Sequence, residues 1–160
     1  MDIRIDEPGV GEWVMDRVTG VFTPGWDHSF SSHRDGEILG GFVVCKYLGA
    51  SATMHMAGLD PGWCSRELLW LAFDYSFNQL GLGKLIAPVR SDNYYGLSID
   101  LRAGWRVEGL IRDVYPGATH MFILTMTKDS CPWLDYKPRQ WRSLDNYSSS
   151  DMLQETSDGR

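Results

Sequence analysis

The sequence predicts an α/β fold, in which helices flank a mixed, mostly antiparallel twisted sheet. Helical and extended segments alternate along the chain, and strand–helix–strand units favour some parallel pairing. Turn signals near both ends of the strand series add antiparallel hairpins. The 160 residues, 43% of them hydrophobic, suit one domain with its own core.

The N-terminal third is expected to hold one helix and a long loop. Apolar residues recur at helical spacing within 10–18, and Gly20 follows as a stop. Those apolar residues are Val10, Trp13, Val14 and Val18. The polar stretch 22–36 reads as a loop, and it ends in a hairpin-type turn at Asp35-Gly36.

An antiparallel strand pair is expected next. Residues 37–48 and 51–59 are rich in β-formers, and Gly49 and Ala50 provide the turn between them.

The clearest helix covers residues 65–80. Ser65 can cap its N-terminus, and Gly81 ends it. Its apolar stripe consists of Leu69, Phe73, Phe77 and Leu80. A short apolar strand, 84–89, comes after it.

The remaining elements are a second helix and a final hairpin. The helix is expected over 94–103, and strands over 105–110 and 120–127 flank a turn at Pro116-Gly117. Residues 142–160 are polar and Ser-rich, so we expect the domain to cover residues 1–141 and the tail to lie outside its core.

Charge and cysteine content exclude several classes of protein. The net charge is −6, with acidic residues spread along the chain, which disfavours a general nucleic-acid coat. The three cysteines form no metal-ligand spacing, and they fit a reduced, cytoplasmic setting without a metal. No segment reads as a membrane span or a signal peptide.

The start of the strong helix is a candidate anion site. Its first N–H groups have no intrahelical partner, and Ser65 and Arg66 add donors beside them. A bound phosphate or pyrophosphate is one reading. An ordinary capped helix is the other, because the loop lacks the glycines that let backbone approach phosphate closely.

Residues 73–85 read FDYSFNQLGLGKL, and residues 104–113 read GWRVEGLIRD. With these segments, residues 40–134 resemble the GNAT superfamily of N-acetyltransferases, and 73–85 are similar to a helix and strand of the branch that acetylates ribosomal-protein N-termini. Residues 104–113 are similar to the family's glycine-aromatic and glutamate-glycine segment, and Asn93 stands eleven residues before it, as in the family. The closing strand also resembles small phage-type members.

The resemblance implies a splayed central strand pair and acetyl-CoA as co-substrate. It implies that the cofactor contacts lie in three places. These are the end of the strand 51–59, the loop and helix start that follow it, and the N-terminal cap of the helix 94–103. The cofactor-binding residues are Leu59, Trp63, Ser65, Arg66 and Asn93. The family's glycine-rich pyrophosphate loop is absent here, and Glu67 adds a negative charge to that stretch.

Three residues are candidates for acid–base catalysis. His55 is the expected base, because it lies on the central strand and titrates near neutrality. Asp100 stands where many family members carry a catalytic Tyr, and Tyr95 is a candidate substitute. The alternatives are that His55 is a sheet histidine with satisfied hydrogen bonds, and that Asp100 faces solvent or pairs with Arg102 or Arg106.

We therefore expect an acetyl-CoA-dependent N-acetyltransferase whose acceptor is an amine on a protein terminus or a small molecule. A homodimer is compatible with the aromatic content. Two other readings stay open. One is a catalytically inactive binding protein on the same fold, and the other is a phage-type enzyme that modifies nucleic-acid bases, which the net charge disfavours.

Overall fold

The computed structural model describes residues 1–59 and 61–138 and confirms the predicted fold class. Its strands are β1 (Asp2–Ile5), β2 (His28–Arg34), β3 (Glu37–Cys45), β4 (Ser51–Gly58), β5 (Lys84–Arg90), β6 (Arg106–Tyr115) and β7 (Thr119–Thr127). Its helices are α1 (Val10–Arg17), α2 (Arg66–Asp74), the π-helical turn η1 (Tyr75–Gln79) and α3 (Tyr94–Arg102).

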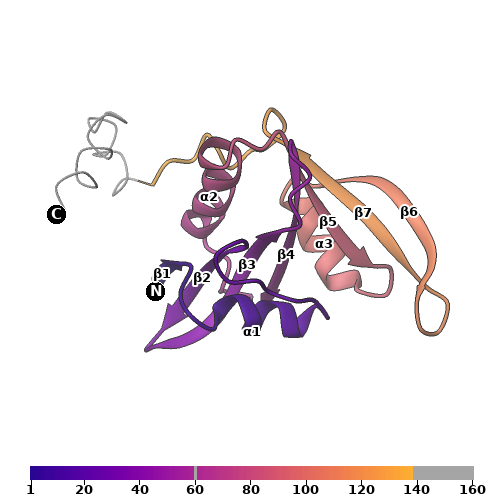
Figure 1. The fold of residues 1–160 in the computed structure, drawn as a ribbon, viewed down its shortest axis with the longest axis horizontal. Helices are drawn as coiled ribbons and strands as arrows, with labels where there is room; N and C mark the ends of the chain where they lie inside the picture. The colour runs from indigo at the N-terminus through magenta and orange to yellow at the C-terminus, as the bar shows by residue number, and fades with distance from the viewer. Residues whose placement is uncertain (60, 139–160) are drawn as a thin grey trace.

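The strands form one mixed sheet in the order β1-β2-β3-β4-β5-β7-β6 (Figure 1). Every neighbouring pair is antiparallel except β4 and β5, which run parallel. The helix α2 connects these two parallel strands, as a crossover requires. The sheet therefore has two antiparallel halves that meet at the β4–β5 junction.

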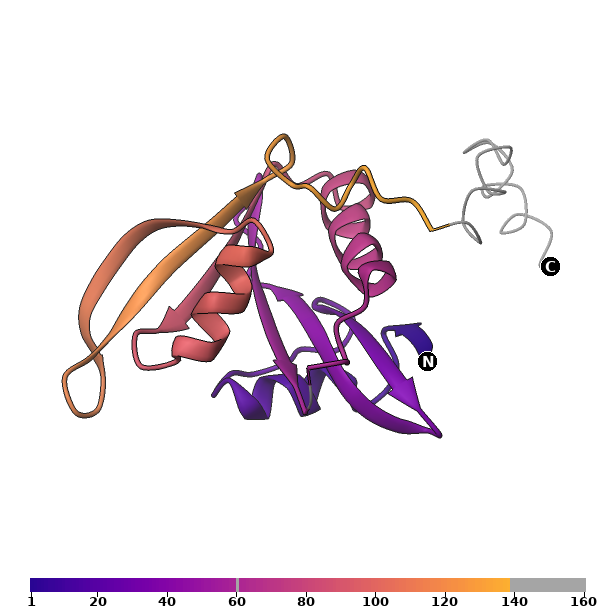
Figure 2. The ribbon, with the colours of Figure 1, turned by 180° about the vertical axis from the view of Figure 1, so that it is seen from behind.

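The helices lie on opposite faces of the sheet. α1 packs on β2, β3 and β4 through a small cluster that includes Val14 and Val43, whereas α2 and α3 cover the other face (Figures 1 and 2). The main core joins Phe73 of α2 to Met54 of β4 and Leu85 of β5. This core supports both halves of the sheet from one side.

The strands β1 and β2 were not predicted, and β2 lies within the stretch 22–36 that we expected to be a loop. The serines and histidines of β2 show no alternation of polar and apolar residues, yet Ser29, Ser31 and His33 are all buried. Ser31 Oγ and His33 Nε2 form a 2.8 Å hydrogen bond that satisfies part of this buried polar surface. The predicted turn at Asp35-Gly36 is confirmed, with both residues at positive φ.

The predicted helix 65–80 is α-helical only to Asp74. It continues as the π-helical turn η1, inside which the Ser76 hydroxyl donates to the carbonyl of Ala72 at 2.7 Å. Phe73 and Phe77 stack with their ring centroids 6.2 Å apart, so the apolar stripe stays on the core side across the change of helix type.

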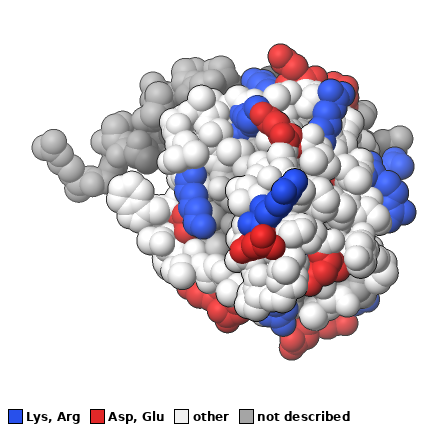
Figure 3. All heavy atoms as spheres, turned by 90° about the vertical axis from the view of Figure 1, so that its right-hand side faces the viewer, with Lys and Arg blue, Asp and Glu red and all other residues white. Residues whose placement is uncertain are grey.

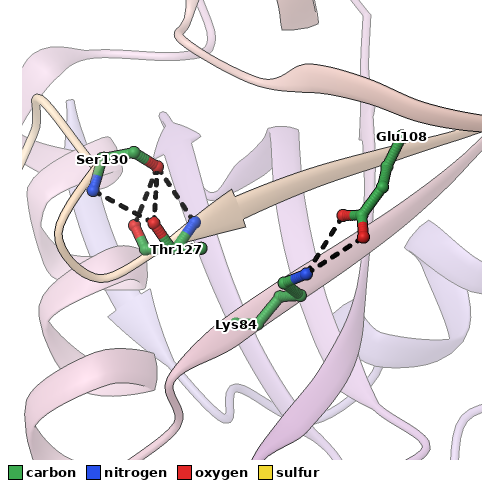
Figure 4. A network of polar contacts seen from close by, with 4 residues as sticks. All are labelled: Lys84, Glu108, Thr127 and Ser130. Atoms are coloured by element: carbon green, nitrogen blue, oxygen red, sulfur yellow. Dashed lines mark hydrogen bonds and ion pairs between the residues drawn. The ribbon is translucent and has the colours of Figure 1, made fainter.

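Polar contacts hold the far half of the sheet together. Lys84 of β5 reaches across β7 to Glu108 of β6, with its Nζ 3.1 and 3.2 Å from the two carboxylate oxygens (Figure 4). Ser130 closes the turn after β7 by hydrogen bonds with Thr127.

The predicted boundary between residues 141 and 142, and with it the tail 142–160, lies outside the described residues. Among the described residues, no helix is long and apolar enough to cross a membrane.

Candidate active site

The central feature of the site is a wedge between β4 and β5. The two strands pair only over Ser51–Thr53 and Lys84–Ile86, although β4 continues to Gly58 and β5 to Arg90. Beyond Thr53 and Ile86 the strands splay apart, as expected for this fold. Strand edges that face a wedge carry backbone groups without sheet partners, which can bind a ligand.

The register identifies which groups of β4 face the wedge. Successive residues of a strand point their N–H and C=O groups to opposite edges. Leu59 donates its N–H to the carbonyl of Leu39 on β3 at 2.8 Å. The backbone N–H and C=O groups of the odd-numbered residues of β4 therefore point towards β3. Met56 and Gly58, which lie beyond the last pair, therefore point their backbone groups into the wedge.

Pro88 explains where the parallel ladder stops. The Ser91 N–H donates to the carbonyl of His120 on β7, so the backbone groups of odd-numbered residues face β7. The backbone groups of the even-numbered residues of β5 therefore face β4. The next rung after Ile86 would run from the N–H of residue 88 to the carbonyl of Met54, and proline has no N–H to donate. One residue type thus ends the pairing and opens the wedge.

The start of α2 lies just beyond the end of β4 in sequence. Ser65 caps this helix, because its Oγ accepts the N–H of Leu68 at 3.1 Å and its carbonyl accepts the N–H of Leu69. The N–H groups of Arg66 and Glu67 have no intrahelical acceptor. With the helix dipole and the exposed Arg66 side chain, they can hold an anionic group such as a pyrophosphate.

Trp63 anchors the loop between β4 and α2. Its ring packs over Gly40 and Gly58, which face each other across β3 and β4, and a Cβ atom at either glycine would collide with it. The ring also lies 5.1 Å from that of Phe42, and the Trp63 carbonyl accepts a 2.8 Å hydrogen bond from Ser32 Oγ. These contacts fix the path of the loop that leads to the helix start.

His55 lies on the opposite face of β4 from this loop. It stands opposite Val43, which packs under α1, and its Nε2 atom is buried with no hydrogen-bond partner within the described residues. Burial lowers the His55 pKa to about 4, and the charge of Lys46 adds to the effect. The imidazole is therefore neutral across the neutral pH range. This corrects the expectation that His55 titrates near neutrality.

Asp100 is buried, which corrects the reading that it faces solvent or pairs with Arg102 or Arg106. It is 4% exposed, and burial raises its pKa to about 7. Neither arginine forms an ion pair with it among the described residues, and Arg102 instead donates to the carbonyl of Ser98 at 3.2 Å. With a pKa of about 7, Asp100 is about half protonated at pH 7 and largely protonated below it.

Cys64, which sequence reasoning missed, lies near Asp100. Burial raises the Cys64 thiol pKa to about 12, and the charge of Asp100 contributes to that rise. The loop before α2 and the last turn of α3 thus lie close together on the same side of the sheet. Only the tertiary fold reveals this proximity, because 36 residues separate the two positions.

The remaining candidates lie at the start of α3 and the end of β4. Asn93 caps α3 by accepting the Gly96 N–H at 2.9 Å. Tyr95 and Leu59 are 61% and 63% exposed, and both are free to contact a ligand. Within the described residues no group of three His, Cys, Asp or Glu side chains could hold a metal ion.

No protein-family model matches the chain, and no curated protein matches it in sequence. Solved structures do match. Mutant forms of the spermidine/spermine N-acetyltransferase SpeG from Vibrio cholerae align with a TM-score of 0.63 at 16% identity, covering 80% of this chain and 95% of that one. SpeG in complex with CoA and spermine aligns with a TM-score of 0.57 at 17% identity, covering 74% of each chain.

A third match is RimJ from Mycobacterium smegmatis in complex with CoA-disulfide. It aligns with a TM-score of 0.56 at 22% identity, covering 68% of this chain and 56% of that chain. At such identities the likeness shows that the chain has the fold of these N-acetyltransferases.

We predict that Pro88→Ala weakens the binding of a ligand that needs the open wedge. The new N–H can bond to the Met54 carbonyl and extend the ladder by one rung, a net gain of about 1 kcal/mol for the closed arrangement. Acetyl-CoA affinity measured by calorimetry should fall about two- to tenfold. Pro116→Ala, in the exposed turn after β6, is the control, and equal effects of both changes would contradict this role of Pro88.

We predict that Asp100→Asn removes a pH-dependent penalty on folding. Because the folded-state pKa lies above the ordinary value of 3.8, the folded protein loses stability as the pH rises from about 4 to about 7. At pH 8 the variant should be more stable than the wild type by about 2–4 kcal/mol, and at pH 4 the two should be nearly equal. Urea unfolding at both pH values checks this, and a difference that does not depend on pH would refute it.

Proposed function

We propose that the protein is an acetyl-CoA-dependent N-acetyltransferase that transfers an acetyl group to a primary amine by direct attack. The observation that carries the proposal is the wedge, with free backbone groups along its β4 edge and a helix N-terminus just beyond it. Acetyl-CoA fits both parts, because its pantetheine arm is amide-like and its pyrophosphate is anionic. It supplies the activated thioester.

We assign the proposed cofactor contacts as follows. Backbone groups of Met56 and Gly58 would bond to the pantetheine arm, with Leu59 at the end of the strand. The amides at the start of α2, together with Ser65 and Arg66, would hold the pyrophosphate. Trp63 would contribute indirectly, because it fixes the path of the loop that leads to α2. Asn93 would contact the cofactor through its side-chain amide, whose oxygen already caps α3.

The proposed reaction needs two proton carriers. The amine nitrogen attacks the thioester carbonyl carbon, while the Met56 N–H donates to the carbonyl oxygen, on which negative charge develops. The carbon–sulfur bond breaks, and Asp100 gives its proton to the departing thiolate. His55 is the proposed acceptor of the proton that the amine loses, reached through water because it lies on the opposite face of β4. Its pKa of about 4 makes it a weak base.

The raised pKa of Asp100 is what suits it to the acid role. A carboxyl group at its ordinary pKa would be ionised at neutral pH and could not donate a proton. Burial keeps a large fraction of Asp100 protonated, and Asp100 lies near Cys64, in the loop that leads to the start of α2. Tyr95, which is 61% exposed, is the second candidate for this role.

The acceptor class is an amine on a protein terminus or a small molecule. A nucleic-acid acceptor has no support, because the net charge is −6 and the face formed by β6 and β7 shows acidic and basic side chains interspersed, without a continuous basic patch (Figure 3).

A catalytically inactive binding protein is the second candidate. The absence of glycines from residues 64–69 and the carboxylate of Glu67 at the helix start favour it, because both oppose close approach of a pyrophosphate.

Calorimetry and turnover together distinguish these functions. We expect acetyl-CoA to bind with micromolar affinity, and Arg66→Ala and Asn93→Ala to weaken binding about fivefold or more through lost polar contacts. Arg102→Ala, on the exposed side of α3, is the matched control and should leave affinity unchanged. Thermal melting of each variant distinguishes a lost contact to acetyl-CoA from destabilisation of α3, whose N-terminus Asn93 caps.

Thiol release is then followed with a panel of peptide and small-molecule amines. Asp100→Asn should lower kcat at least tenfold while leaving acetyl-CoA affinity nearly unchanged, because it removes only a proton donor. Binding without thiol release for every amine would favour the inactive binding protein. No binding at millimolar acetyl-CoA would exclude the proposed function.

A further inference from the structure

Three small residues form a row across β2, β3 and β4. Ser32 pairs with Gly40, and Gly40 pairs with Gly58, so the three stand opposite one another in consecutive strands (Figure 1). Residues that pair directly across antiparallel strands point to the same face of the sheet. The row therefore leaves a strip of that face without bulky side chains, and the strip ends at the β4 edge that borders the wedge.

Trp63 fills this strip with both its side chain and its main chain. The indole ring lies against Gly40 and Gly58, where a Cβ atom would collide with it. The Trp63 carbonyl accepts the 2.8 Å hydrogen bond from the Oγ of Ser32, which is fully buried. Phe42 adds a ring contact on the same face of β3. Packing thus holds the ring, and the serine hydroxyl holds the backbone of the same residue.

These contacts lie between the two parts of the proposed cofactor site. On one side, the ring packs on Gly58, whose backbone groups face the wedge. On the other side, only Cys64 separates Trp63 from Ser65, which caps α2. The body of α2 is held separately by buried side chains such as Leu68. The contacts of Trp63 therefore determine how the segment that enters α2 is placed relative to the edge of β4.

This arrangement offers a physical reason why the start of α2 can lack glycines. Residues 64–69, CSRELL, contain none that would let the backbone adjust around a pyrophosphate. A segment that is already held in its binding conformation loses less conformational entropy when the ligand binds. Here the glycines lie in the sheet instead, at 40 and 58, where they make room for the ring that holds the segment.

We propose that Ser32 is a positioning residue for the cofactor site, which acts through Trp63 to hold the start of α2 in a fixed relation to the β4 edge. Gly40 belongs to the same arrangement, because it makes room for the ring. Since Ser32 is fully buried, it makes no contact with the cofactor itself. The inference rests on the proposed function, because it concerns how acetyl-CoA meets the wedge and the helix start together.

Calorimetric titration with acetyl-CoA tests the role of Ser32. Ser32→Ala removes the donor to the Trp63 carbonyl and should weaken binding about three- to tenfold, the equivalent of one hydrogen bond. Ser29→Ala is the matched control. It makes the same change in the same strand at a residue that is 1% exposed, but the Ser29 Oγ has no hydrogen-bond partner within the described residues. Its acetyl-CoA affinity should equal that of the wild type.

A double-mutant cycle with Arg66→Ala distinguishes positioning from a general loss of stability. If Ser32 acts through the start of α2, the loss of affinity in the double variant should be smaller than the product of the two single losses. A merely structural role of Ser32 would make the two losses multiply. Thermal melting confirms that each variant is folded at the temperature of the titration.

The outcomes separate this inference from the proposed function. If the wild type binds acetyl-CoA and Ser32→Ala binds it equally tightly, or if the losses in the cycle multiply, the role of Ser32 is refuted and the proposed function stands. Equal weakening by Ser29→Ala and Ser32→Ala would also refute that role. If the wild type binds no acetyl-CoA, the proposed function fails and this inference fails with it.

Discussion

The single short parallel pairing between β4 and β5 is the constraint on which the rest of the structure depends. Three residues on each strand join the two halves of the sheet, and beyond them the strands diverge. The junction would be weak alone. It persists because one buried core includes Phe73 of α2, Met54 of β4 and Leu85 of β5, so the core bridges both halves. Hydrophobic packing on one face thus allows backbone groups in the sheet plane to stay unpaired.

The acid–base features follow from that packing. α2 and α3 must lie on the same face to complete the core, and this brings the loop at Cys64 close to Asp100. The cost is a buried carboxyl without a cationic partner within the described residues, which raises its pKa towards neutrality. His55, on the opposite face, pays a similar desolvation cost in the opposite sense. Two titratable groups on opposite faces of the sheet therefore carry pKa values shifted by burial.

The sequence predicted the elements whose periodicity or turn residues are strong, including α1, α3, the β3–β4 hairpin and the helix start at Ser65. It missed β2, because buried serines and His33 give no alternating pattern. Of the site, spacing placed Asn93 and Asp100 two turns apart on one helix, but burial of Asp100 depends on contacts across the fold. One sequence feature could have predicted the wedge, namely Pro88 within a central strand, because proline has no N–H to continue the ladder.

The most direct test of the account is amide hydrogen exchange of β4, resolved by residue, with and without acetyl-CoA. If the cofactor occupies the wedge, exchange should slow at Met56 and Gly58, whose N–H groups face it. Exchange at His55 and Ala57 should change little, because their N–H groups point to β3. Equal protection of all four residues, or no change in β4 while the ligand is bound, would contradict the claim that this wedge is the cofactor site.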